Sequence, residues 1–250
     1  SLQNSFGLLF GNILGYIVSI FFILKSKVIN QYFKFKNLPI KNVAIKYKKF
    51  PKYDVSSVLV NVLANQLPIL TLGKFFGLGV LGLYSLMYKV LMIPINLLSN
   101  TISDVFKQKA TKDYNRLGNC MDIFISTFKK LILIGIIPFS LLGVFAPDIF
   151  SFIFGEKWKI AGEFAQIMTP MLFLKFVINP LSYTFYIAQK QHLDLIGQVV
   201  LFLFVSISIF IGLEFNNAEI LLISFSISYS IMYILYLSFS YKYSKGNKID

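Results

Sequence analysis

Two lysines, Lys89 and Lys175, lie deep inside long apolar stretches of this sequence. Lys89 is about ten residues into its stretch, or about 15 Å along a helix that rises 1.5 Å per residue. A charged side chain at membrane depth is costly and generally marks a ligand site or a transport pathway. Both charges are cationic, and no carboxylate occupies a comparable depth in the sequence. The pair therefore predicts a wet cavity that attracts an anion.

Other polar side chains are candidates for lining the same cavity. Three of them share or border the Lys89 face at three- or four-residue steps, namely Tyr84, Tyr88 and Asn96. Three more form a polar patch within an earlier apolar stretch, namely Asn61, Asn65 and Gln66. Tyrosine rings and amides can bond to a polar ligand in a cavity, but they also join helices to one another in a bundle. Packing is therefore the alternative for these six, as bonding to helix carbonyls is for the lysines.

The elements that must position these residues are helices that cross a membrane. Hydrophobic residues make up 56% of the 250, mean hydropathy is +0.69, and aromatic residues reach 17%. The apolar runs show no sustained alternation of the kind a membrane barrel requires. Each is near the roughly 20 residues that a helix needs to span a bilayer. The sequence predicts an all-α polytopic membrane protein with about seven transmembrane helices, at 4–24, 55–75, 79–105, 131–154, 162–188, 194–213 and 219–240.

The basic residues predict the orientation of these helices. Most of the 24 Lys and Arg residues lie in 25–52, in 107–130 and after the last span, which would place these segments and the C-terminus in the cytoplasm. Seven spans then put Ser1 outside. Since no basic signal region precedes the first span, we expect the C-terminal part of a longer protein rather than a complete seven-span protein.

The expected organisation has four parts. They are a transmembrane helix left from a truncated first lobe, a basic cytoplasmic linker, a six-helix transmembrane lobe and a basic cytoplasmic tail, at 1–24, 25–54, 55–241 and 242–250. Within the lobe, apolar residues recur at three- or four-residue spacing over 106–130. This pattern predicts an amphipathic helix or helix pair at the membrane interface, broken near Gly118.

Two blocks of sequence resemble a known family. The stretch 47–110 contains FPKYDV, NQLPIL, FFG and GLYSLMYKVLMIPINLLSNTISDVF, and 145–182 reads FAPDIFSFIFGEKWKIAGEFAQIMTPMLFLKFVINPLS. These blocks resemble helices seven to ten of Wzx-type polysaccharide flippases, which move O-antigen or other lipid-linked oligosaccharides. Those flippases belong to the multidrug/oligosaccharidyl-lipid/polysaccharide exporter superfamily. Their relatives often carry Arg where this chain has Lys89, which would act as a point charge instead of a bidentate group.

The resemblance implies a fold and a function. Two six-helix lobes would face each other across a cavity that opens alternately to either side, with 1–24 as the sixth helix and 55–240 as the second lobe. The cargo would be an undecaprenyl-pyrophosphate-linked oligosaccharide, carried across the bacterial cytoplasmic (inner) membrane. The implied partners are this anionic glycan and membrane lipids, and contacts with other polysaccharide-assembly proteins stay open. We expect no enzyme activity, no cofactor and no nucleic acid, and leave coupling to H⁺ or Na⁺ open.

Two other functions compete with this one. A multidrug or cation antiporter of the same superfamily would need buried carboxylates, and the sequence places Asp54, Asp104, Asp148 and Asp194 near span ends, so we expect none in this lobe. A membrane glycosyltransferase or polymerase would need an acidic catalytic loop outside, whereas the predicted outer loops are only a few residues long. His192 has no second metal ligand nearby in sequence, so we expect no metal site.

Overall fold

The computed structural model describes residues 2–25 and 53–246, and the chain forms two compact units, Ser1–Tyr47 and Lys48–Asp250. The first unit contains one described helix, α1 (Leu2–Lys25), whose stretch Leu14–Ile23 is apolar. Most of the predicted linker and part of the predicted tail lie outside the described residues. The predicted division into four parts therefore stays a prediction.

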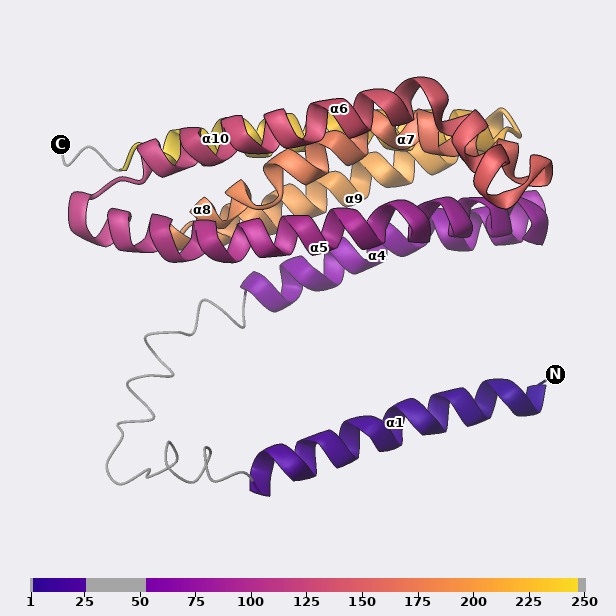
Figure 1. Cartoon of the computed structure of the whole chain (residues 1–250), viewed down its shortest axis with the longest axis horizontal. Helices are drawn as coiled ribbons and strands as arrows, with labels where there is room; N and C mark the ends of the chain where they lie inside the picture. Colours follow the sequence, from indigo (N-terminus) through magenta and orange to yellow (C-terminus); the bar gives the residue numbers. More distant parts are fainter. Residues whose placement is uncertain (1, 26–52, 247–250) are drawn as a thin grey trace. The chain divides into compact units, whose positions relative to one another are not determined.

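All elements described in the second unit are helical, and the long helices run back and forth along one direction (Figure 1). The long helices are α4 (Val55–Thr71), α5 (Gly77–Leu117), α6 (Met121–Phe154), α7 (Lys159–Ile178), α9 (Gln191–Glu214) and α10 (Ala218–Ser244). Shorter pieces join them: a π-helical turn at Leu72–Phe76, 3-10 turns at Glu156–Trp158 and Leu181–Tyr183, and α8 (Thr184–Ile187).

Five helical segments among the described residues are long and apolar enough to cross a membrane, against the seven spans predicted. They are Val55–Leu117, Met121–Phe154, Glu156–Ile178, Gln191–Glu214 and Ala218–Ser244. The first contains both α4 and α5, which the turn at Leu72–Phe76 separates, and Gly77 follows that turn with φ +89°. The all-helical prediction is confirmed, whereas the arrangement as one lobe of a two-lobe exporter stays a prediction.

The predicted break near Gly118 is present, but the segments on either side of it are the ends of two long helices and not a separate interfacial helix pair. Gly118 adopts φ +73° and ends α5, and its N–H donates to the carbonyl oxygen of Tyr114 at 2.9 Å. The segment 106–117 continues α5, and 121–130 opens α6. Phe106 and Phe124 are buried, with ring centroids 6.4 Å apart. The apolar periodicity of 106–130 thus packs the two long helices together.

The predicted span 162–188 is shorter than expected. The helix α7 ends at Ile178, and Pro180 then leads into the 3-10 turn and α8. Proline lacks the N–H that continues a helix, so the chain turns at this point. The turn matters for function because it carries side chains from 179–186 toward the start of α9.

Neighbouring helices pack closely where their residues are small. At Gly162 in α7, an added Cβ would lie 2.5 Å from the carbonyl oxygen of Ala146 in α6. At Gly212 in α9, it would collide with the Cβ of Leu221 in α10. The helices α4 and α10 both pack along α9, so α4 comes together with two helices that are distant from it in sequence.

Candidate functional site

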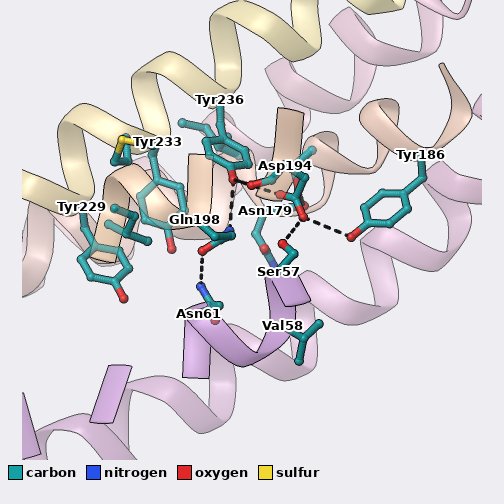
Figure 2. A pocket seen from close by; sticks show the side chains of 14 residues that line it. Ser57, Val58, Asn61, Asn179, Tyr186, Asp194, Gln198, Tyr229, Tyr233 and Tyr236 are labelled. Carbon is teal, nitrogen blue, oxygen red and sulfur yellow. Dashed lines mark hydrogen bonds between the residues drawn. The ribbon is translucent and has the colours of Figure 1, made fainter. Parts of the chain in front are cut away.

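A pocket of about 220 Å³ lies where α4, α9 and α10 meet the turn that follows α7 (Figure 2). Its lining comes from four places in the sequence: Ser57, Val58 and Asn61 from α4, Ile178, Asn179, Ser182 and Tyr186 from 178–186, Asp194, Gln198 and Leu201 from α9, and Tyr229, Met232, Tyr233 and Tyr236 from α10. Helical spacing explains the grouping, because residues three or four apart share one helix face. The pocket is thus built from one face of each helix.

The Asp194 carboxylate, in the first turn of α9, is the centre of the hydrogen bonds in this pocket. It is only 9% exposed. Ser57 donates to Oδ2 at 2.5 Å, and Tyr236 donates to Oδ1 at 2.9 Å, as Figure 2 shows. The hydroxyl of Tyr186 lies 3.4 Å from Oδ2, a long contact. These neutral hydroxyl donors from three separate segments hold a buried charge.

The network continues from Asp194 along α9 and into α4. Gln198 donates from Nε2 to the hydroxyl of Tyr236 at 3.1 Å and accepts at Oε1 from Asn61 at 2.8 Å. Asn65, one turn further, donates to the backbone oxygen of Asn61 at 2.7 Å. A continuous chain of polar groups therefore links α4, α9 and α10 inside the bundle.

Tyrosines form the opposite wall of the pocket. Tyr229 is 2% exposed, and its buried hydroxyl has no hydrogen-bond partner among the residues that the structure describes. Its ring centroid lies 6.0 Å from that of Tyr233. A buried hydroxyl without a partner costs free energy, so its presence in a pocket lining favours a ligand that bonds to it.

Charge in the pocket is negative. Asp194 is the single charged side chain of the lining, which contains no Lys, Arg or His. The carboxyl of Asp54, just before α4, is near enough to interact with this charge: burial first and the nearby Asp194 second raise its pKa. One Asp54 oxygen, Oδ1, is buried without a hydrogen-bond partner in the described part of the chain. Such a pocket is suited to neutral hydroxyl groups or to a cation, and not to a phosphate.

The residues predicted from sequence are distributed over several environments. Asn61 alone among them lines the pocket. The side chains of Lys89, Asn96 and Gln66 are exposed on the surface of the second unit. Lys175 is partly buried, and its Nζ lies 3.6 Å from the sulfur of Met92. The two lysines thus lie in different environments, outside the pocket lining.

The two tyrosines predicted as cavity residues, Tyr84 and Tyr88, lie in α5 near the tyrosines of the pocket. Tyr84 is buried and Tyr88 partly buried, with their rings stacked at 5.8 Å. The phenol groups of Tyr88, Tyr229 and Tyr233 are near enough to influence one another electrostatically. An aromatic cluster therefore connects α5 with the tyrosine wall of the pocket.

Sequence reasoning missed most of the pocket. Ser57, Asp194, Gln198 and Tyr236 were not among the candidates, although helical spacing places Ser57 four residues before Asn61 and Asp194 four before Gln198. The expectation that this part of the chain holds no buried carboxylate is wrong, because the turn at Pro180 and the close approach of α4 cover Asp194. A position at a helix end does not imply exposure.

The described residues contain no group of three or more His, Cys, Asp or Glu side chains that could hold a metal ion. His192 is exposed, and its ring lies 6.3 Å from that of Tyr53 in an edge-on contact. Its environment is that of a surface aromatic pair.

The helices and the pocket define a helical membrane protein with a polar site enclosed between apolar helices. A family model described as "Polysaccharide biosynthesis protein" matches residues 3–162, and the chain belongs to this family. The match includes the whole block 47–110 and the start of the block 145–182. The resemblance inferred from those blocks is confirmed at this level.

Curated relatives match about half of the chain. It is 27% identical over 132 residues to the teichuronic acid biosynthesis protein TuaB of Bacillus subtilis (strain 168), covering 52% of this chain and 27% of that protein. It is 28% identical over 137 residues to the lipopolysaccharide biosynthesis protein WzxC of Escherichia coli (strain K12), covering 54% and 27%. The amylovoran biosynthesis protein AmsL of Erwinia amylovora is 22% identical over 134 residues, covering 54% and 34%.

The matched region is therefore about a third or less of the length of these relatives. No solved structure matches the chain. This chain is a polysaccharide biosynthesis membrane protein and a distant relative of Wzx-type exporters.

Proposed function

We propose that the protein is a flippase that moves an undecaprenyl-pyrophosphate-linked oligosaccharide across the bacterial cytoplasmic membrane by alternating access. The observation that carries the proposal is the polar pocket enclosed by apolar helices in a member of a polysaccharide biosynthesis family. Ligand sites between membrane helices are characteristic of transporters, whose helices rearrange around them. Three relatives are named for the biosynthesis of teichuronic acid, lipopolysaccharide and amylovoran.

The two lysines would attract the pyrophosphate of this substrate. The side chain of Lys89 is exposed on the surface of the second unit. Its ammonium group would be free to bind the substrate in a cavity that borders this face of α5. Lys175 lies in α7, which packs against α5, and its Nζ has the sulfur of Met92 as its neighbour. Tyr88, Asn96 and the other predicted polar residues would border the path of the glycan. The basic segments and the C-terminus would face the cytoplasm.

One observation favours a second function. The buried Asp194 is the kind of carboxylate that a cation antiporter requires, and the sequence had not revealed its burial. A multidrug or cation antiporter of the same superfamily is therefore the alternative. The two functions differ in cargo, since a lipid-linked glycan is anionic and the drugs that such antiporters export are cationic.

The test is the leaflet distribution of lipid-linked glycan in cells that lack the full-length gene. Accumulation on the cytoplasmic face, with loss of surface polysaccharide, is the expected result. Normal sidedness together with lost resistance to cationic drugs would support the antiporter instead. The gene is then returned as wild type, as Lys89→Ala and as Lys109→Ala, the last being an exposed lysine of α5 that serves as the matched control. Export should fail with Lys89→Ala at normal membrane insertion and recover with Lys109→Ala.

A further inference from the structure

We infer that the Asp194 pocket binds one uncharged sugar ring of the glycan, and that it excludes the pyrophosphate. The inference rests on the proposed function and refines it, because it separates the place where the sugar binds from the place where the lysines attract the anion. Four features of the pocket support it: its size, its charge, its hydrogen-bonding groups and its aromatic wall.

The size of the pocket limits the ligand. A volume of about 220 Å³ is smaller than the roughly 300–1,000 Å³ typical of sites for drug-sized molecules. It therefore suits a single ring better than a whole oligosaccharide. The lining is about equally polar and apolar in character, with Leu201 and Met232 beside Gln198 and Asp194. A sugar ring has the same mixture, with hydroxyls around its edge and C–H groups on its faces.

The charge of the pocket decides which part of the substrate enters. Asp194 is the charged group of the lining, and Asp54 lies close enough to interact with it. A pyrophosphate would be repelled by these carboxylates, and the lining offers no ammonium or guanidinium group to neutralise it. Lys175 contacts Met92 and lies outside the lining. The anionic and the neutral parts of the substrate would therefore bind at separate places.

The hydrogen-bonding groups match sugar hydroxyls in kind. Asp194 already accepts from the hydroxyls of Ser57 and Tyr236, so its environment is built for O–H donors. The contact from Tyr186 is long at 3.4 Å, which leaves the carboxylate capacity for a further donor, because two carboxylate oxygens offer about four lone-pair sites. A sugar hydroxyl can take the place of the Tyr186 contact without leaving a charge unpaired.

The tyrosine wall supplies the second half of the site. The hydroxyl of Tyr229 lacks a protein partner among the described residues although the side chain is 2% exposed, and it lines the same pocket as Tyr233 and Tyr236 (Figure 2). Phenol groups offer an apolar face and a polar tip, which suits the alternation of C–H and O–H groups on a sugar. The unpartnered hydroxyl is independent of the Asp194 network, so two separate observations point to one ligand.

The experiment measures sugar binding by saturation-transfer NMR on the full-length protein in nanodiscs, without any detergent that carries a sugar headgroup. The probes are the methyl glycosides of glucose, galactose and N-acetylglucosamine, with sodium pyrophosphate and sodium chloride as competitors. We expect at least one glycoside to give a signal that pyrophosphate does not displace. Tyr229→Phe should weaken that binding about fivefold, as the loss of one hydrogen bond predicts, and Gln198→Ala at least as much.

The matched control is Tyr241→Phe, since Tyr241 is on the same helix, lies outside the pocket lining and is 41% exposed. This variant should bind as the wild type does. Absence of a signal from every glycoside would overturn the inference. Displacement of the bound glycoside by pyrophosphate would also overturn it. Displacement of the glycoside by sodium, if Asp194→Asn abolishes that effect, would overturn it too and would identify a cation site. Translocation of lipid-linked glycan is measured on the same preparations. A wild-type protein that translocates the glycan but binds no glycoside refutes the sugar site alone, and a wild-type protein that does not translocate the glycan refutes the flippase.

Discussion

The contact between α6 and α7 at Gly162 and the polar region around Asp194, where α4, α9 and α10 meet, join helices by different means. In the first, Gly162 lies against the backbone of Ala146 and Pro147, where an added Cβ would meet both at 2.5 Å. In the second, long polar side chains such as Gln198 and Tyr236 reach across and leave a pocket between the helices. Lipid provides no hydrophobic drive for helices to associate, so both close packing and hydrogen bonds hold them.

The difference shows which contact can change. A close backbone contact between small residues has one arrangement, and any added atom disrupts it. Hydrogen bonds among hydroxyl and amide groups can be exchanged for bonds to a ligand at little net cost. The α6–α7 contact at Gly162 is thus a fixed part of the fold, and the polar region around Asp194 is a part in which binding and local rearrangement can occur.

The largest effect is expected from breaking the close contact. Gly162→Leu would force α6 and α7 apart, because the nearest atoms are backbone and have no room to shift. Overpacking of this kind costs at least about 1–3 kcal/mol, so the Tm of the purified protein should fall and its yield with it. Gly143→Ala is the matched control on α6, since its Cβ would meet only Thr169 at an ordinary 3.7 Å. Equal losses in both variants would contradict the comparison.

The second-largest loss of stability is expected from breaking the hydrogen bonds around Asp194. Asp194→Ala would leave the hydroxyls of Ser57 and Tyr236 without their acceptor, at a cost of about 1–3 kcal/mol for each buried group. Asp194→Asn keeps one acceptor oxygen and should lose much less. Thermal unfolding of both variants, followed by circular dichroism, measures the difference. If Asp194→Ala unfolds as the wild type does, the network does not hold these helices together.

A smaller change should come from moving one side chain within the pocket. In Gly197→Ala, the new Cβ would lie 2.5 Å from the hydroxyl oxygen of Tyr236 and push that side chain away from Asp194. A flexible side chain can yield where a backbone cannot, so we expect a Tm loss well below that of Gly162→Leu, together with weaker ligand binding. Gly82→Ala in α5, with nothing within 4 Å of its Cβ, should be neutral or slightly stabilising. A binding defect in Gly82→Ala would show that the effect is not local.

The sequence predicted the helices better than it predicted the pocket, for a physical reason. Length, apolarity and a glycine that interrupts a periodic pattern are properties of single segments, so the helical class and the break near Gly118 could be inferred without knowing any neighbour. The burial of Asp194 depends on Ser57, which is 137 residues away in the sequence, and on Tyr236 of another helix. Lys89 and Lys175 stood out because they interrupt apolar runs, whereas Asp194 lies at a helix end where a charge needs no explanation.

The smallest effect concerns the charge at the entrance to α4. Burial, and then repulsion from Asp194, raise the pKa of the Asp54 carboxyl above its ordinary 3.8, so the folded protein binds this proton more tightly than the unfolded chain. The stability that Asp54 contributes is therefore fully present below pH 3.8 and is lost as pH rises through the raised pKa. Asp54→Asn should remove this loss, raising the Tm slightly at neutral pH and flattening its fall with pH. Asp104→Asn, at an aspartate whose side chain is 77% exposed, is the control that should leave the profile unchanged. A pH profile of Tm that stays the same in Asp54→Asn would mean that neither burial nor the charge of Asp194 raises the pKa of this carboxyl in the folded protein.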